Sequence, residues 1–200
     1  MEIGAFDRWI IYIQITGRIG EDGRMELWDI YDRDKRVTGR TMVRDDWNLK
    51  EGEYHLSVLA VIKRSDGKYL ITKRAEDKAW AAGWWEVSGG AVKSGESSFE
   101  AVKREIREET GLDVSGAKGG FLYDYRRDNI KEGDNYFVDV YLFEMEFSES
   151  DIHLQEEETD GFQIVDYDRI RQYGEEGIFL HFESLQRAFF QRTLPSPGAT

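Results

Sequence analysis

The feature that most constrains the fold is one uninterrupted segment in the middle of the chain, GAVKSGESSFEAVKREIREETGL. Within it, Phe99, Val102 and Ile106 recur at helical spacing, which predicts a helix over Ser97–Thr110. Gly111 follows directly, in the position where a glycine ends many helices. One side of this helix is apolar and must border a core.

Three carboxylates lie close together on the predicted helix. Glu105, Glu108 and Glu109 are spaced at i, i+3 and i+4, which places them on one sector beside the apolar stripe. Crowded carboxylates repel one another, and a divalent cation with oxygen ligands, such as Mg²⁺ or Mn²⁺, relieves the repulsion. The residues alone leave two interpretations open: a metal site, or a solvated helix whose glutamates pair with arginines such as Arg104.

A glycine pair and a loop lead into this helix. Gly89 and Gly90 are expected to end a strand and to let the backbone approach a ligand without an intervening side chain. The loop then runs through Gly95 and Glu96. Arg104 is placed to pair with Glu108 or with Glu96 and to hold a carboxylate in one rotamer.

The rest of the chain mixes predicted strands with helices. The segments with strand patterns are 25–32, 55–63, 68–73, 121–125, 136–147 and 162–165. Helical patterns cover 168–173 and 179–191. Strands interleaved with a few helices predict an α/β or α+β fold.

Three parts of the chain differ in pattern. Residues 1–24 hold a short β-branched run and a glycine-rich stretch, and they are interpreted either as an extra strand or as a tail. Residues 25–192 are predicted to form one domain. Residues 193–200 carry both prolines and are predicted to be a flexible tail.

Composition excludes several classes of function. With 40 acidic and 27 basic side chains the formal charge is −13, which argues against a nucleic-acid partner, because such proteins need clustered Lys and Arg. The absence of cysteine excludes disulfides, thiolate zinc sites and cysteine nucleophiles. The apolar run Trp9–Ile15 is far shorter than the roughly 20 residues of a spanning helix. We therefore expect a cytoplasmic protein without a membrane partner.

The central segment resembles the Nudix box at every fixed position. Counted from Gly90 it runs G-x5-E-x7-R-E-I-x-E-E-x-G-L. The preceding residues GWWEVSG resemble the approach Gly-x-Trp-Glu-x-Pro-Gly of that family, with Ser88 where proline is common. The resemblance covers roughly residues 25–173. The stretch WDIYDRDKRVTGRT looks like the subgroup related to isopentenyl-diphosphate isomerase.

This resemblance implies a fold and a chemistry. The implied fold is α/β, an α/β/α sandwich with a mixed β-sheet and a loop–helix–loop metal site. Family members typically hydrolyse a nucleoside diphosphate linked to another moiety, with Mg²⁺ or Mn²⁺ as cofactor. The implied metal ligands are the Gly90 carbonyl, Glu105, Glu108 and Glu109. The resemblance also implies that Arg104 and Glu96 orient these carboxylates.

Further candidates lie outside the box. The segment LQEEETDGFQIV resembles the loop that supplies another glutamate in the family, so Glu157 and Glu158 are candidates, and a solvated acidic loop is the alternative. Two cations and two aromatic residues are candidates for contacts with the substrate: Lys73, Arg74, Trp80 and Trp84. The alternatives are a surface pair beside a hairpin for the cations and burial in the core for the tryptophans.

The expected function is Mg²⁺-dependent hydrolysis of a diphosphate linkage in a nucleoside diphosphate derivative or a similar small phosphorylated metabolite. A non-catalytic module that senses a nucleotide metabolite is the main alternative. An isomerase of isopentenyl diphosphate is disfavoured, because such enzymes need a cysteine, and RNA-end processing is disfavoured by the acidic charge. A homodimer is possible through the strand at 136–147 or the N-terminal run.

Overall fold

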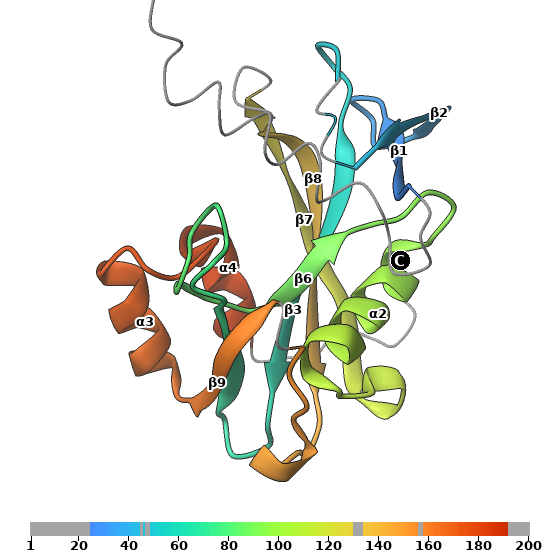
Figure 1. Cartoon of the computed structure of the whole chain (residues 1–200). Helices are drawn as coiled ribbons and strands as arrows, with labels where there is room; N and C mark the ends of the chain where they lie inside the picture. Colours follow the sequence, from blue (N-terminus) through green and yellow to red (C-terminus); the bar gives the residue numbers. More distant parts are fainter. Residues whose placement is uncertain (1–24, 45, 47–48, 130–133, 156–157, 192–200) are drawn as a thin grey trace, which may run out of the picture. The chain divides into compact units, whose positions relative to one another are not determined.

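The computed structural model describes residues 25–44, 46, 49–129, 134–155 and 158–191 (Figure 1). The predicted segments 1–24 and 193–200 lie outside the described residues, so the domain boundaries stay a prediction. The chain divides into two compact units. The ranges of the smaller unit are Met1–Leu56, Ala91–Glu96 and Arg126–Phe137, and those of the larger unit are Ser57–Gly90, Ser97–Tyr125 and Val138–Thr200.

A two-stranded antiparallel sheet dominates the smaller unit. Strand β1 (Leu27–Tyr31) pairs with β2 (Val37–Val43), and Trp28 lies opposite Met42. Trp28, Ile30 and Met42 form a small buried cluster on this hairpin. The cluster gives the hairpin an apolar face to bury, which an isolated two-stranded sheet needs for stability.

The sheet of the larger unit is built from seven strands, in the order β5-β4-β3-β8-β7, with β6 paired to β3 and β9 paired to β4. Strands β3, β7 and β8 also contribute residues to the smaller unit. The strand bounds are β3 His55–Lys63, β4 Tyr69–Arg74, β5 Trp85–Glu86, β6 Ser88–Ala91, β7 Lys118–Asn129, β8 Asp134–Glu144 and β9 Thr159–Val165. Strand β4 is antiparallel to β3, β5 and β9, which confirms the predicted hairpin between β3 and β4.

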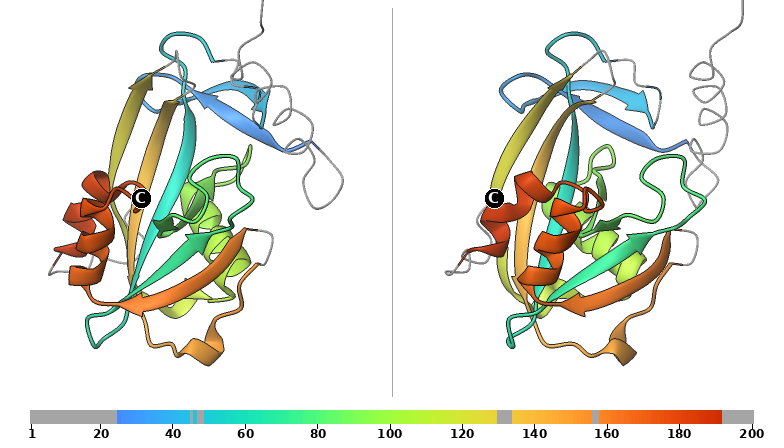
Figure 2. Two further views of the ribbon diagram at one scale, coloured as in Figure 1. Left: turned by 60° about the vertical axis from the view of Figure 1, so that its left-hand side comes forward. Right: turned by 90° about the vertical axis from the view of Figure 1, so that its left-hand side faces the viewer.

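Helices cover both faces of this sheet. Helix α2 (Ser98–Thr110) lies on one face, and α3 (Tyr167–Glu175) and α4 (Phe182–Phe189) lie on the other (Figure 2). Two short 3₁₀ helices, η1 (Val114–Gly116) and η3 (Glu149–Asp151), complete the described elements. The predicted α/β sandwich with a mixed sheet is therefore confirmed.

Local signals set both ends of α2. The Ser97 side chain accepts a hydrogen bond from the backbone N–H of Glu100, whose side chain accepts in return from the Ser97 backbone, so a capping box begins the helix. Gly111 ends it with a φ of 76°, and its N–H donates to the Arg107 carbonyl. Glycine suits that position, because the left-handed backbone conformation is strained for a residue that carries a side chain. The predicted end of the helix at Gly111 is confirmed, and the helix starts one residue after the predicted Ser97, which caps it.

The apolar face of α2 differs from the prediction at one position. Val102, Ile106 and Thr110 are fully buried at four-residue spacing, whereas Phe99 is 36% exposed. Phe99 precedes Val102 by three residues and so falls at the edge of the buried face. Its ring lies beneath the ammonium of Lys103, 5.3 Å from the centroid.

No helix among the residues that the structure describes is long and apolar enough to cross a membrane.

His55 is a buried base in the smaller unit. It is 4% exposed, and its ring stacks on Trp28 at 4.7 Å and contacts Tyr136 at 5.3 Å. Burial lowers the pKa of His55 from 6.5 to about 4. The neutral ring therefore packs as an aromatic residue.

We predict that His55 makes stability depend on pH. Because its folded pKa lies below its unfolded pKa, its contribution is complete above pH 6.5 and is lost as the pH falls towards 4. At pH 4.5 this loss amounts to about 2.5 kcal/mol of unfolding free energy. Urea unfolding at pH 7 and pH 4.5 should show a smaller loss in His55→Phe than in wild type. The exposed His153→Gln is the control, and equal losses in all three proteins would contradict the assignment.

Candidate functional site

The inner side of α2 meets the glycine pair that precedes it. A side-chain carbon at Gly90 would lie 2.7 Å from Oε2 of Glu105 and closer still to the carboxyl carbon. A side-chain carbon at Gly89 would lie 2.7 Å from Leu59 Cδ2 and closer still to the Val58 carbonyl oxygen on β3. Gly89 therefore lets β6 approach β3, and Gly90 leaves room for a carboxylate against the backbone.

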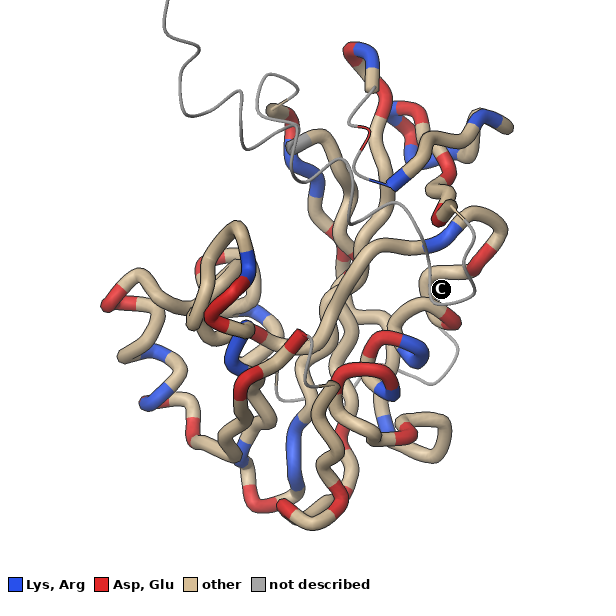
Figure 3. The backbone as a smooth tube through the Cα atoms, in the orientation of Figure 1, with Lys and Arg blue, Asp and Glu red and all other residues tan. Residues whose placement is uncertain are grey.

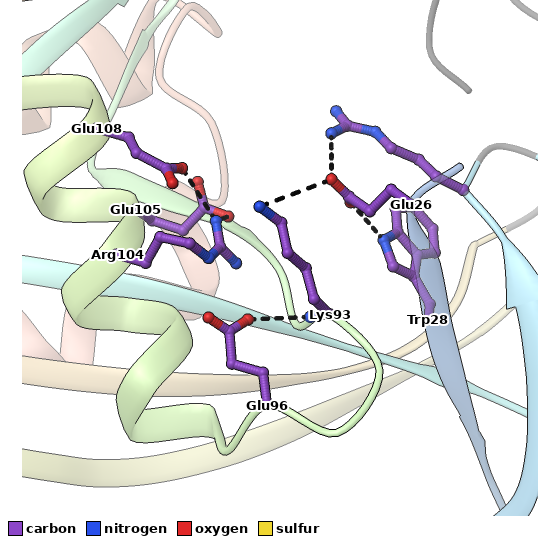
Figure 4. Close-up of polar contacts among 8 residues, drawn as sticks. Glu26, Trp28, Lys93, Glu96, Arg104, Glu105 and Glu108 are labelled. Carbon is purple, nitrogen blue, oxygen red and sulfur yellow. Dashed lines mark hydrogen bonds and ion pairs between the residues drawn. The ribbon is translucent and has the colours of Figure 1, made fainter. Parts of the chain in front are cut away.

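Arg104 holds two of the three predicted glutamates. One guanidinium nitrogen, Nη1, donates to Glu105 Oε1 at 2.7 Å and to Glu108 Oε2 at 3.0 Å (Figure 4). The Arg104 side chain is only 19% exposed, so solvent screens these contacts less than those of a surface pair. Figure 3 shows that this helix carries both acidic and basic positions. The predicted pair of Arg104 with Glu108 is present, and it draws the two carboxylates towards one point.

Glu109 is the most enclosed acid of the cluster. The residue as a whole is half-buried, but its Oε2 is shielded from solvent and has no hydrogen-bond partner among the described residues. Burial, followed by the negative charges of Glu86 and Glu105, raises the pKa of Glu109 well above its usual range. Hydrogen bonds from the Ser88 side chain and the Gly89 backbone act in the opposite direction. The structure thus confines more negative charge here than it neutralises.

Glu86 is a fourth acid of this cluster that the sequence did not single out as a site residue. It lies on β5, and burial raises its pKa to about 7 even though Arg74 lowers it. The Arg74 guanidinium donates from Nη1 to both carboxylate oxygens, at 3.3 and 3.2 Å. The sequence signal that could have identified Glu86 is its place in the segment GWWEVSG, where it is the one charged residue and directly follows two tryptophans.

The predicted substrate contacts lie at the end of β4 and in the loop between β4 and β5. Lys73 pairs with Glu76 at 2.7 Å, and Arg74 pairs with Glu86, so both cations have intramolecular partners. Trp80 is 63% exposed, which contradicts the alternative that it fills the core. Trp84 is half-buried.

The acidic loop before β9 supplies one described candidate. Glu158 pairs with Lys78 at 2.5 Å, and its carbonyl accepts from the backbone of Ala75. Its charge also raises the pKa of Glu86, after the larger effects of burial and of Arg74. Glu157 lies outside the described residues.

Glu96 belongs to the smaller unit. Its Oε2 accepts from the backbone N–H of Lys93 at 3.0 Å, which closes the loop before α2 (Figure 4). The Lys93 ammonium lies 3.9 Å from Glu26 Oε2, and Glu26 also accepts from Trp28 Nε1 at 2.8 Å. In the same loop, Asp29 accepts from the Ser94 hydroxyl and the Gly95 N–H. The loop is therefore tied to the β1 hairpin.

These residues fit a hard cation, although within the described ranges no three acidic or histidine side chains already stand in the arrangement of a metal site. Arg104 draws together the carboxylates of Glu105 and Glu108, and a shielded oxygen of Glu109 has no hydrogen-bond partner in the described part of the chain. The donors are all oxygens and the local charge is negative, which suits Mg²⁺ or Mn²⁺.

Comparisons with known proteins agree with this fold. The model of the NUDIX domain matches residues 53–183. An uncharacterized Nudix hydrolase of Listeria monocytogenes is 32% identical over 168 residues, which cover 82% of this chain and 94% of the relative. The nucleoside triphosphatase NudI of Escherichia coli is 46% identical over 55 residues, 28% of this chain and 39% of NudI. A crystal structure from Deinococcus radiodurans has a TM-score of 0.67 at 22% identity, covering 83% of this chain and all of the other, and supports the fold alone.

Substitution by alanine should have different effects at Gly89 and at Gly90. Gly89→Ala should lower the free energy of unfolding by about 3 kcal/mol, because the new methyl group meets the backbone of β3. Gly90→Ala should cost about 1 kcal/mol or less, because the Glu105 carboxylate stands at the end of a flexible side chain and can move. Urea unfolding of both variants measures the difference. A larger loss for Gly90→Ala than for Gly89→Ala would contradict this geometry.

Proposed function

Because the chain belongs to the Nudix family of hydrolases, we propose that it cleaves a diphosphate linkage in a nucleoside diphosphate derivative or a similar small phosphorylated metabolite, with Mg²⁺ as cofactor. The observation that supports this most directly is the convergence of Glu105, Glu108 and the enclosed Glu109 beside Gly90. The similarity to NudI, a nucleoside triphosphatase, is consistent with chemistry on a phosphoanhydride. The isomerase-like subgroup stays a prediction.

The candidate metal ligands are the Gly90 carbonyl and the carboxylates of Glu105, Glu108 and Glu109. When bound, Mg²⁺ or Mn²⁺ neutralises charge on the diphosphate oxygens and lowers the pKa of a coordinated water. Arg104 keeps two of these carboxylates aimed at one point while they are ligands. This orientation limits the rearrangement that binding would otherwise need.

The reaction itself is an in-line displacement by water. The water oxygen forms a bond to phosphorus, the bridging P–O bond breaks, and a carboxylate of the cluster takes the proton. Glu158 beyond the box is a second candidate for this proton. Arg74 and Lys73, at the end of β4, are candidates to contact the phosphate oxygens, and a phosphate would then compete with Glu86 and Glu76 for them.

The proposal predicts a specific loss of activity in Glu108→Gln. The substitution keeps the size of the side chain and removes a negative charge that the cation needs. We expect kcat to fall about 100-fold or more on any nucleoside diphosphate derivative that the wild type turns over with Mg²⁺. Phosphate release from a panel of such compounds measures it.

The matched control is Glu175→Gln, the same change on an exposed part of α3, which should retain wild-type activity. If no compound turned over, or if Glu108→Gln equalled wild type, the proposed hydrolase activity would be wrong.

A second prediction concerns metal binding without turnover. Glu109→Gln removes a charge from an enclosed site, so the metal-free variant should be at least as stable as the metal-free wild type. Mg²⁺ should raise the Tm of the wild type, because it binds the folded state, and should raise that of the variant much less. Thermal unfolding with EDTA and with 10 to 20 mM Mg²⁺, roughly the range that saturates a weak site, separates the two effects. Equal Mg²⁺ shifts would show that Glu109 is not a ligand.

A further inference from the structure

A buried carboxylate on β8 contacts the first turn of α2. Asp139 is 5% exposed, and its Oδ2 accepts a hydrogen bond from the hydroxyl of Ser98, the first residue of the helix. The Ser98 oxygen also lies 2.8 Å from the hydroxyl oxygen of Tyr141, two residues further along β8. Because the single hydroxyl proton of Ser98 goes to Asp139, the Tyr141 hydroxyl is the donor in this second bond. These three polar side chains join the helix to the sheet.

The surroundings of this polar network are apolar. Tyr141 is 1% exposed, and the rings of Phe121 and Phe143 lie 5.8 and 5.9 Å from its ring. A carboxylate in such a place gives up its hydration, and an apolar side chain of similar size often stabilises a core as well or better. What the network supplies is a defined geometry, because hydrogen bonds form only within a narrow range of distance and direction.

Helix α2 transmits this geometry to the acidic cluster. Glu105 follows Ser98 by seven residues and Glu109 follows it by eleven, so each lies within about 20° of Ser98 around the helix axis. The two glutamates therefore project from the same side of α2, about 10 and 16 Å further along it. Val102 and Ile106, between them, make apolar contacts that have no preferred direction. The bond at Ser98 adds the directional contact that apolar packing lacks.

We infer that Asp139 is a positioning residue for the metal site, which acts through Ser98 to fix the rotation of α2 and its place along β8. This inference rests on the proposed function. Mg²⁺ demands near-ideal octahedral geometry, and a site works only when its ligands stand within about 0.5 Å of their productive positions. A small slide or rotation of α2 is therefore enough to weaken the ligands that it carries. Asp139 lies outside the box, and its effect reaches the carboxylates through the helix.

Metal binding without substrate tests this role. Titration with Mn²⁺, followed by electron paramagnetic resonance of the free ion, gives a dissociation constant that does not depend on turnover. Ser98→Ala removes the hydroxyl that joins the helix to Asp139, and it should weaken Mn²⁺ binding about 10-fold or more. Ser98→Thr keeps a hydroxyl at that position and should recover most of the affinity. The kcat on any compound that the wild type turns over should fall and recover in parallel.

A second variant separates positioning from stability. Asp139→Leu has a similar size and leaves the hydroxyls of Ser98 and Tyr141 bonded to each other, so its Tm in EDTA should equal or exceed that of the wild type. Its Mn²⁺ affinity should still fall about 10-fold or more. The control is Ser148→Ala, which loses a bond of the same kind, 2.7 Å to Asp151 Oδ2, in the exposed turn at η3. It should bind Mn²⁺ as the wild type does.

The possible results distinguish this role from the proposed function. If Ser98→Ala and Asp139→Leu bind Mn²⁺ as tightly as the wild type, the positioning role is overturned while the hydrolase proposal stands, whatever the change in Tm. An equal loss of affinity in Ser148→Ala would also overturn it, because the effect would not be specific to α2. If the wild type binds no Mn²⁺ and hydrolyses no compound of the panel, the proposed function itself fails.

Discussion

Crowded carboxylates on the inner side of α2 repel one another, and much of the surrounding structure holds them in place against that repulsion. Arg104 bonds two of them from a single nitrogen, and the absence of a side chain at Gly90 leaves room for one of the two. Glu109 is enclosed with Glu86 and Glu105 as negative neighbours. A cation would relieve this accumulation, and that requirement joins the geometry of the site to the hydrolysis proposed for it.

The fold supports this cluster by fixing helix α2 against the paired strands β6 and β3. The capping box at Ser97 and the left-handed Gly111 set where α2 begins and ends, and its buried residues set its rotation. Because successive residues of a helix differ by about 100° in direction, a rotation by one residue would move the glutamates off the inner side. Gly89 brings β6 against β3, and this approach determines how closely the backbone borders the carboxylates.

Arg74 extends the cluster outward. Its guanidinium contacts the half-buried Glu86 and the exposed Trp80, so one side chain extends from the acidic cluster to the surface of the β4–β5 loop. A site for a phosphorylated ligand needs cations that contact the phosphates and a surface that contacts the remaining group. Arg74 is such a cation, and the ring of Trp80 beside it is an exposed surface. Residues outside the box, such as these, decide which group is accepted, since one fold serves many substrates.

The sequence by itself determined the ends of α2, the sector that holds its three glutamates, and the strand on either side of the β3–β4 turn. Each of these depends on residues near one another in the chain, where periodicity and capping act directly. Only the tertiary structure decided that Phe99 lies at the edge of the core, that Trp80 is exposed, and that Glu86 joins the carboxylates of α2. Burial and electrostatic coupling depend on which distant segments approach, and no local pattern around Glu86 encodes its distance from Glu109.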